Sequence, residues 1–431
     1  MQRTRIAAYV VVSLSLVAAT NLMPKKHQTV PLIVAPSGDA PNDSSRSPIL
    51  AGSGKVAALA TNATNLVGTD VDAVRDILVV KLRKGLITCA SVSTEGVKAD
   101  GDSDDPALDK RGRHVAFASL ATNLVEGDSN GVQDIFVHDV RTAGTVRASV
   151  ATDGTEADGP SQQPWVSSSG RYVVFASEAT NLVADDTNGA SDIFLRDLVA
   201  GTTQRVSVAA DGTQGDGDSL LPRVSGTGRY VAFVSQAQNL VALDDNNSRD
   251  VFVRDLKTGA MEIASVSTGG AAANGHCDTL SLSANGRYVA FDSRAGNLDV
   301  ADEHEGLDVF LRDRRKHTTK LVSKVAGDGV VDGASTQPAL SGNGKWLAFS
   351  SGATSLVPGD LNEATDVFRV KLKSSYLERV SVSSTGSEAD NTSDSPALSR
   401  SGKFVVFSTR ATNLFGGGAT DGTWAVALRK P

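Results

Sequence analysis

Short runs of apolar residues, separated by polar loops, recur along almost the whole chain. Typical runs are Val173–Ala176 and Ile193–Leu195, each bounded by polar positions. The apolar positions are consecutive rather than alternating, which is typical of strands covered on both faces. No stretch within the recurring part has the 3.6-residue period of an amphipathic helix. The pattern therefore predicts an all-β chain.

The runs belong to a repeat of fixed length. A motif that begins Gly-[Arg/Lys] and continues into an apolar run returns every 58 residues, without a visible insertion. An aspartate stands 22 residues after the motif in six copies, and Trp424 takes that position in the last copy. The seven motifs begin at Gly54, Gly112, Gly170, Gly228, Gly286, Gly344 and Gly402.

Each copy is long enough for four short strands. In the second copy we expect one strand after Pro106, and others at His114–Ala118, Asp134–Val140 and Thr145–Ala151. Four antiparallel strands in every repeat predict a blade of a β-propeller. Seven copies predict seven blades, whereas a six-bladed ring would leave one complete copy without a place.

The two ends of the repeated region complement each other. The chain ends at Pro431, directly after the third strand of the seventh copy. Residues Leu32–Pro48 align without gaps on Ala90–Pro106, the segment that holds a fourth strand. We therefore expect the N-terminal segment to supply the fourth strand of the last blade, which closes the ring and removes an exposed sheet edge. Residues 29–431 then form a single domain.

The first residues have the pattern of an export signal. Arg3 and Arg5 precede a mostly apolar run, Ile6–Ala19, that ends in small residues. This run is shorter than the roughly 20 residues that cross a bilayer as a helix. We expect a signal peptide at 1–19, a short linker at 20–28, a periplasmic or secreted mature protein and no stable membrane span after cleavage. An uncleaved anchor is the alternative.

Charge and cysteine content narrow the function further. The 42 Lys and Arg residues against 49 Asp and Glu residues give a net charge of -7, which argues against binding to nucleic acid because phosphate contacts need a basic surface. Cys89 and Cys277 are too few for a disulfide framework or a structural zinc site.

The loop between the second and third strands carries the strongest candidate for a metal site. Its Asp-x-[Asp/Asn]-x-x-x-Asp pattern offers the oxygen ligands that Ca²⁺ prefers. The alternative is structural, since Asp and Asn also cap turns by accepting backbone N–H groups. The candidate ligands are Asp70, Asp72, Asp76, Asp128, Asn130, Asp134, Asp186, Asn188, Asp192, Asp244, Asn246, Asp250, Asp360, Asn362 and Asp366. Blade five has His304 within the pattern. No other cofactor is expected.

A second acidic position lies in the loop between consecutive copies, where a turn-forming role is favoured. Its residues are Asn42, Asp100, Asp158, Asp216, Asn274, Asp332 and Asp390. These two kinds of long loop emerge on one face of a propeller, and binding residues concentrate on long loops held by a rigid scaffold. The long-loop face is therefore the candidate binding face.

The opposite face shows two positions that change together. Four copies with Arg after the glycine carry Asp at the end of the third strand, which predicts the pairs Arg113–Asp139, Arg171–Asp197, Arg229–Asp255 and Arg287–Asp313. Copies with Lys there carry a second base instead, so blades one, six and seven should form a basic sector from Lys55, Lys81, Lys345, Lys371, Lys403 and Arg429.

No arrangement of residues predicts catalysis. The Gly127–Gly131 segment matches Gly-x-Ser-x-Gly, but a nucleophile elbow needs a following helix. The six histidines are single departures from the repeat, without the spacing of metal ligands.

The Pro-x-x-Ser-x-x-Gly-[Arg/Lys]-x-Val-Ala-Phe stretch, followed by Asp-[Ile/Val]-Phe-Val-x-Asp-Leu, resembles the propeller repeats of the TolB family. Within it, Ala121–Val125 and Ala179–Val183 (Ala-Thr-Asn-Leu-Val) resemble an exported bacterial subgroup. The resemblance implies a propeller fold and an envelope or extracellular protein partner. We therefore expect an exported, non-enzymatic binding or scaffold protein that uses its acidic long-loop face for protein or cation binding. The alternative is an extracytoplasmic hydrolase or lyase acting on a polysaccharide or peptide in the propeller channel.

Overall fold

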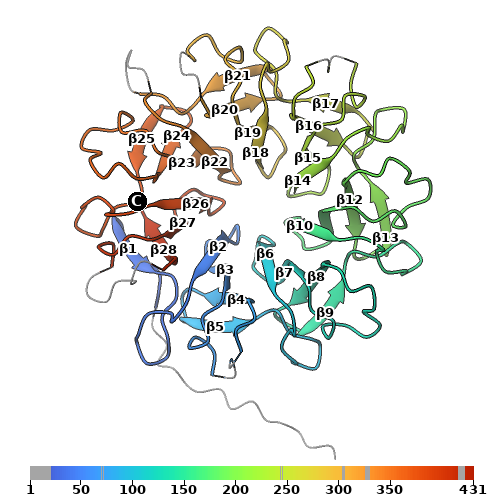
Figure 1. Ribbon diagram of the computed structural model, residues 1–431. Coiled ribbons are helices and arrows are strands. Elements are labelled where there is room, and N and C mark those ends of the chain that lie inside the picture. The colour runs from blue at the N-terminus through green and yellow to red at the C-terminus, as the bar shows by residue number, and fades with distance from the viewer. Residues whose placement is uncertain are drawn as a thin grey trace, which may run out of the picture.

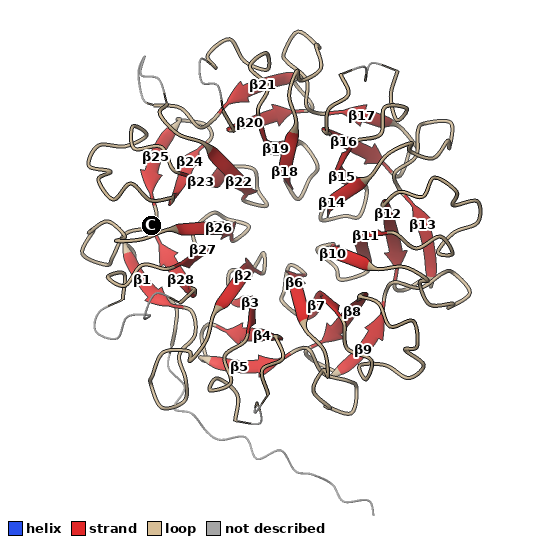
Figure 2. Ribbon diagram, viewed as in Figure 1, coloured by secondary structure: helices blue, strands red, loops and turns tan. Residues whose placement is uncertain are grey.

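Seven small sheets surround a central axis (Figure 1). The computed structural model describes residues 21–68, 70, 72–242, 244, 246–302, 306–325, 331–415 and 423–431, and these form strands, turns and loops without a helix (Figure 2). Every sheet has four antiparallel strands, so the chain is a seven-bladed β-propeller, as the repeat predicts. The expected signal segment, 1–19, and His304 lie outside the described residues. In the part described, no helix has the length and apolar character of a membrane span.

Each blade is built from four consecutive strands, except the last. Blade one holds β2 (Ser45–Leu50), β3 (Val56–Thr61), β4 (Asp76–Lys81) and β5 (Leu86–Cys89), and blade two holds β6 (Ser103–Leu108), β7 (His114–Ser119), β8 (Asp134–Asp139) and β9 (Gly144–Arg147). Blade three holds β10 (Ser161–Val166), β11 (Tyr172–Ser177), β12 (Asp192–Asp197) and β13 (Thr202–Arg205), and blade four holds β14 (Ser219–Val224), β15 (Tyr230–Ser235), β16 (Asp250–Asp255) and β17 (Met261–Ile263). Blade five holds β18 (Cys277–Leu282), β19 (Tyr288–Ser293), β20 (Asp308–Asp313) and β21 (Thr318–Leu321), and blade six holds β22 (Ser335–Leu340), β23 (Trp346–Ser351), β24 (Asp366–Lys371) and β25 (Tyr376–Arg379). Blade seven holds β26 (Ser393–Leu398), β27 (Val405–Thr409), β28 (Ala425–Lys430) and β1 (Gln28–Pro31).

In six blades the innermost strand runs through the proline instead of following it, and blade five has Leu280 at this position. In β6 the pairing with β7 shifts between Asp104 and Ala107, and Asp105 has a φ of 52°. This β-bulge accommodates Pro106, which has no N–H group to give to the ladder. The sequence-based start of this strand was wrong because a bulge tolerates a proline that a regular strand would exclude.

The core consists of similar layers between neighbouring blades. The second and third strands are almost completely buried, which explains their continuous apolar runs. Five blades place a pair of stacked phenylalanines on these strands, with ring centroids 5.8 to 5.9 Å apart. Repetition of one packing unit around the ring gives a rigid base for the loops.

The N-terminal segment supplies the strand that closes the ring, as predicted, but this strand is Gln28–Pro31 and lies just before the Leu32–Pro48 segment that the alignment indicated. β1 pairs antiparallel with β28. In Figure 1 the two strands lie side by side, although their colours come from opposite ends of the scale. Thr29 Oγ1 donates to the carbonyl of Val382 in blade six at 2.6 Å. Thr145 makes the same contact with Val92 between blades two and one. The closing seam therefore repeats an ordinary blade interface.

Blade seven contains one extra residue that the constant spacing of the motifs hides. Thr409 pairs with Ala425, whereas the equivalent Ser119 pairs with Asp134. The connection before β28 is thus one residue longer than in blade two. The prediction that Trp424 takes the aspartate position was wrong, because Ala425 takes it.

The same shift moves Arg429 out of the predicted basic sector. Arg429 pairs with Val405 and occupies the buried position of His138, while Lys430 takes the position after it. Only 6% of Arg429 is exposed, and its Nη1 donates to the carbonyls of Val382 and Ser383 at 3.2 Å each. This arginine stabilises the contact with blade six.

Candidate functional site

The predicted arginine–aspartate pairs are all present on the face of the short turns. Arg171 Nη2 lies 2.6 Å from Asp197 Oδ2, and hydrogen bonding to Arg171 lowers the pKa of Asp197 to about 2. The arginine also stacks over Tyr172 at 4.9 Å. The same ion pair joins Arg113 to Asp139 at 2.5 Å, Arg229 to Asp255 at 2.6 Å and Arg287 to Asp313 at 2.6 Å.

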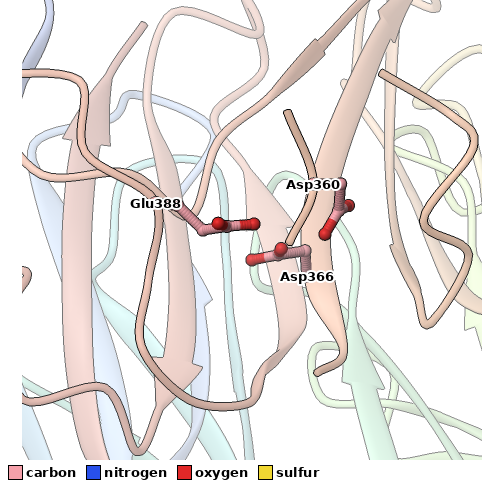
Figure 3. Close-up of side chains that lie close together, drawn as sticks. All are labelled: Asp360, Asp366 and Glu388. Carbon is pink, nitrogen blue, oxygen red and sulfur yellow. The ribbon is translucent and has the colours of Figure 1, made fainter. Parts of the chain in front are cut away.

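On the long-loop side, three carboxylates of blade six converge on one arginine. Asp360, Asp366 and Glu388 have oxygens within 4.8 Å of one another, and Figure 3 shows their side chains pointing together. Arg379, at the end of β25, places Nη1 3.2 Å from an oxygen of Asp360 and of Asp366, and also contacts Glu388. Its Nη2 donates to the carbonyl of Gly359 at 2.9 Å. We call this group of acids around a basic side chain a cage.

Blades two and three repeat the cage. Arg147 Nη1 lies 3.1 Å from Asp128, 3.3 Å from Asp134 and 2.8 Å from Glu156. In blade three, the corresponding nitrogen of Arg205 contacts Asp186 at 2.9 Å, Asp192 at 3.2 Å and Gln214 at 2.8 Å.

Blade one forms the cage with a different basic residue. Cys89 stands at the position of Arg147, and Lys98 stands at the position of Glu156. Lys98 Nζ contacts Asp72 at 2.6 Å and Asp76 at 2.8 Å, and also pairs with Asp70. The cation has moved from the position of Arg147 to the position of Glu156, and a cation is still kept among the acids.

The remaining candidate ligands also face side chains of the protein. Asn130 Nδ2 donates to Asp134 Oδ2 at 2.8 Å, and Asn188 and Asn362 make the same bond in their blades. In blade four Asn246 donates to Asp250 at 2.7 Å, but Ile263 takes the place of the arginine. Asp244 is nearly buried in the same loop.

The structure thus brings the predicted metal ligands together in blades one, two, three and six and places a cation of the protein among them. Sequence reasoning missed Arg147, Arg205, Arg379 and Lys98, although the first three recur at one position of the repeat. Burial and the nearby carboxylates of Asp134 and Glu156 raise the pKa of Asp128 to about 6. Calcium binding stays a prediction.

The second acidic position ties neighbouring loops together. Asp100 Oδ1 accepts the backbone N–H of Thr122 at 2.7 Å, and Asn123 Oδ1 accepts the N–H of Asp100 at 3.2 Å. Ala121 and Leu124 are buried beside them. The Ala-Thr-Asn-Leu motif therefore joins two loops, and Asp158, Asp216 and Asp390 accept the equivalent backbone bond.

The residues that carry reactive groups are dispersed. His114 Nδ1 lies 2.7 Å from Asp109, His138 Nδ1 lies 2.9 Å from Thr145, and His276 accepts the backbone N–H of Arg249. Ser129 donates to Glu156 in a loop that leads into β8. Each of these histidine and serine side chains is hydrogen-bonded to another residue of the propeller.

Comparison with known proteins supports the fold. No protein-family model matches the sequence, and a search of curated proteins found no match. An oligogalacturonate lyase in complex with manganese is 10% identical, with 95% of this chain and 99% of that chain covered and a TM-score of 0.55. The β-propeller domain of the Trilobed protease from Pyrococcus furiosus is 9% identical, with 86% and 93% covered and a TM-score of 0.52.

The structural neighbours also include TolB proteins. TolB from Acinetobacter baumannii is 14% identical, with 78% of this chain covered and a TM-score of 0.41. The chain spans 62% of that protein's length, less than two thirds of it. Sequence identities this low show the fold alone. The lyase and the protease domain, whose TM-scores exceed 0.5, show that this chain has the β-propeller fold.

Proposed function

We propose that the chain is an exported, non-enzymatic binding or scaffold protein whose long-loop face meets a protein partner with a basic surface. The observation that carries this proposal is a contrast between the two faces. The recurrent aspartates of the turn face are paired with arginines, whereas the long loops around blades one to three keep exposed carboxylates. Charged faces of opposite sign steer partners together and set their orientation.

We define the acidic sector by five exposed acids of these loops: Glu95, Glu126, Asp153, Asp185 and Asp211. Glu95, Asp153 and Asp211 occupy one position in three successive blades. None of the five lies within 4 Å of a lysine or arginine nitrogen among the described residues. Val97 and Leu120, which are 54% and 53% exposed, add apolar surface in the same loops. Acidic and apolar groups side by side suit a protein partner.

The enzyme alternative requires acids or histidines that converge on the channel. Among the described residues that line the channel cavity, Asp105 is the one carboxylate. The likeness to a lyase concerns the fold, and fold alone does not choose a chemistry. The binding proposal therefore rests on the exposed surface.

The test is crosslinking of the tagged full chain in its native host. We expect a discrete crosslinked partner that is lost when Glu95→Gln, Asp153→Asn and Asp211→Asn are combined. A control with Asp39→Asn, Asp43→Asn and Glu363→Gln removes three exposed acids elsewhere and should retain the partner. Identical crosslinks in all three proteins would contradict the proposal. N-terminal sequencing of the extracytoplasmic form tests export in the same samples.

A further inference from the structure

The central channel holds a cavity of about 420 Å³. It is lined by the second half of each innermost strand and by the turn that follows, so all seven blades contribute. The core positions repeat almost unchanged around the ring, but the positions that face the cavity differ from blade to blade. The bulge position reads Ser47, Asp105, Gln163, Leu221, Thr279, Gln337 and Ser395.

Several of these polar groups have a structural role. Gln163 Oε1 accepts the backbone N–H of Leu221 at 2.8 Å, and Gln337 Oε1 accepts that of Ser395 at 2.9 Å. Each bond satisfies an N–H group of the bulge in the next blade. The oxygens of these two amides are therefore occupied, so the charged groups of the wall are the stronger candidates for recognising a ligand.

One such group is a guanidinium on the channel wall. Arg223 stacks over the indole of Trp165, with Cζ 4.4 Å from the ring centroid. One of its N–H groups donates to the carbonyl of Pro222 at 2.9 Å. A guanidinium has five N–H donors in a fixed plane, so most of its donors remain for a ligand. The two residues stand at the same position of blades three and four, where the other blades have Ile, Ala or Ser.

Two further cations line the cavity at the rim. Most of the rim residues are small: Gly52, Ser168, Gly226, Ala284 and Gly342. Lys110 and Arg400 stand at the two remaining rim positions, one on each side of Gly52. The backbone N–H of Ser53 donates to the carbonyl of Lys110 at 2.8 Å, and the backbone N–H of Arg400 donates to the carbonyl of Gly52 at 3.1 Å.

The charge of the cavity is opposite to that of the protein. Its lining contains three cations, Lys110, Arg223 and Arg400, and one carboxylate, Asp105, although the chain carries a net charge of -7. A concave site lined by one sign of charge concentrates ligands of the other sign. Pro48, Leu50 and other apolar side chains complete the wall. Such a wall suits an organic molecule better than a bare ion.

We propose that the channel binds a small organic oxyanion, with the guanidinium of Arg223, held flat on Trp165, as the main recognition group and with Lys110 and Arg400 as additional cations. The site is separate from the acidic sector, so either proposal can fail without the other. Arginine matches the planar geometry of carboxylate and phosphate groups, which lysine does not reproduce.

The test is calorimetric titration of the full mature chain with citrate and, separately, with inorganic phosphate, each against sodium chloride of equal ionic strength. We expect saturable binding of at least one anion and a loss of affinity of tenfold or more in Arg223→Met. Arg171→Met removes another stacked arginine, on the outer turn face, and should bind as the wild type does. Binding of citrate alone would identify a carboxylate ligand, and binding of phosphate alone would identify a phosphate ligand.

A second variant keeps the test meaningful if Arg223→Met does not fold. Arg223→Lys keeps the positive charge, and the proposal requires it to weaken binding while its melting temperature stays near that of the wild type. Equal affinity in wild type and Arg223→Lys, or heats of binding that sodium chloride reproduces, would overturn the proposal. Failure of both citrate and phosphate to bind the wild type would also overturn the proposal.

Discussion

Arg379 lies between Asp360 and Asp366, with one nitrogen 3.2 Å from a carboxylate oxygen of each. All three side chains are almost fully buried. Removing the cation would leave buried carboxylates without compensation, which is much more costly than loss of an exposed ion pair. We predict that Arg379→Leu lowers the free energy of unfolding by about 3 kcal/mol, measured by urea denaturation.

The matched control for this prediction is Arg171→Leu, because that arginine is 42% exposed and pairs on the turn face. It should lower the free energy of unfolding much less than Arg379→Leu does, because solvent screens an exposed ion pair. Equal losses for the two variants would show that the cage does not depend on its central cation.

Cys89 and Lys98 provide a second test within blade one. Lys98→Glu replaces the cation with a fourth acid and should destabilise the protein by about 3 kcal/mol. Adding Cys89→Arg recreates the arrangement of Arg147 and Glu156 in blade two. The double-mutant cycle should therefore give a favourable coupling energy of about 1 to 3 kcal/mol. Additive effects of the two substitutions would contradict the exchange of roles.

The acids of the two faces should respond to pH in opposite directions. Asp128 has a folded-state pKa of about 6, above the ordinary value of 3.8, so the folded protein binds its proton more tightly than the unfolded chain. Its contribution to stability is present below about pH 4 and is lost as pH rises through about 6. Asp128→Asn should therefore increase the free energy of unfolding at pH 8 by about 1 kcal/mol.

Asp139 is the counterpart, because Arg113 holds the pKa of its carboxyl well below the usual range. Its contribution is present above the unfolded value of about 4 and is lost as pH falls toward the lower, folded value. Asp139→Asn should decrease stability at pH 8 by about 0 to 1 kcal/mol, and the difference should begin to shrink as the pH falls below about 4. Urea melts of both variants from pH 3 to 8 check these signs, and a shift in the same direction at pH 8 would count against them.

Closure of the ring predicts that Thr29 behaves like an internal residue. Its hydroxyl bonds to Val382 across the seam, as that of Thr145 bonds to Val92 between internal blades. Thr29→Val and Thr145→Val should each cost about 1 kcal/mol. A Thr29 variant as stable as the wild type, beside a destabilised Thr145 variant, would mean that the seam does not form in solution.

The repeat allowed the blades, their number, the closing strand and pairs such as Arg171–Asp197 to be predicted, because each follows from a period or from two positions that change together. The bulge at Pro106 could not be predicted, since a proline normally interrupts a strand. The extra residue before Ala425 was hidden because the chain ends before another motif could reveal the shift. Arg147 was overlooked because an arginine on an outer strand resembles an ordinary surface residue until the loops fold over it.

The most direct measurement of whether the loop acids are neutralised by the protein's own cations is a calcium titration. After treatment with a chelator, the melting temperatures of the wild type and of Arg379→Leu are compared with and without millimolar Ca²⁺. We predict that Ca²⁺ raises the melting temperature of the variant, whose three acids have lost their cation, by several degrees more than that of the wild type. A rise of several degrees in the wild type, with no greater rise in the variant, would contradict the account.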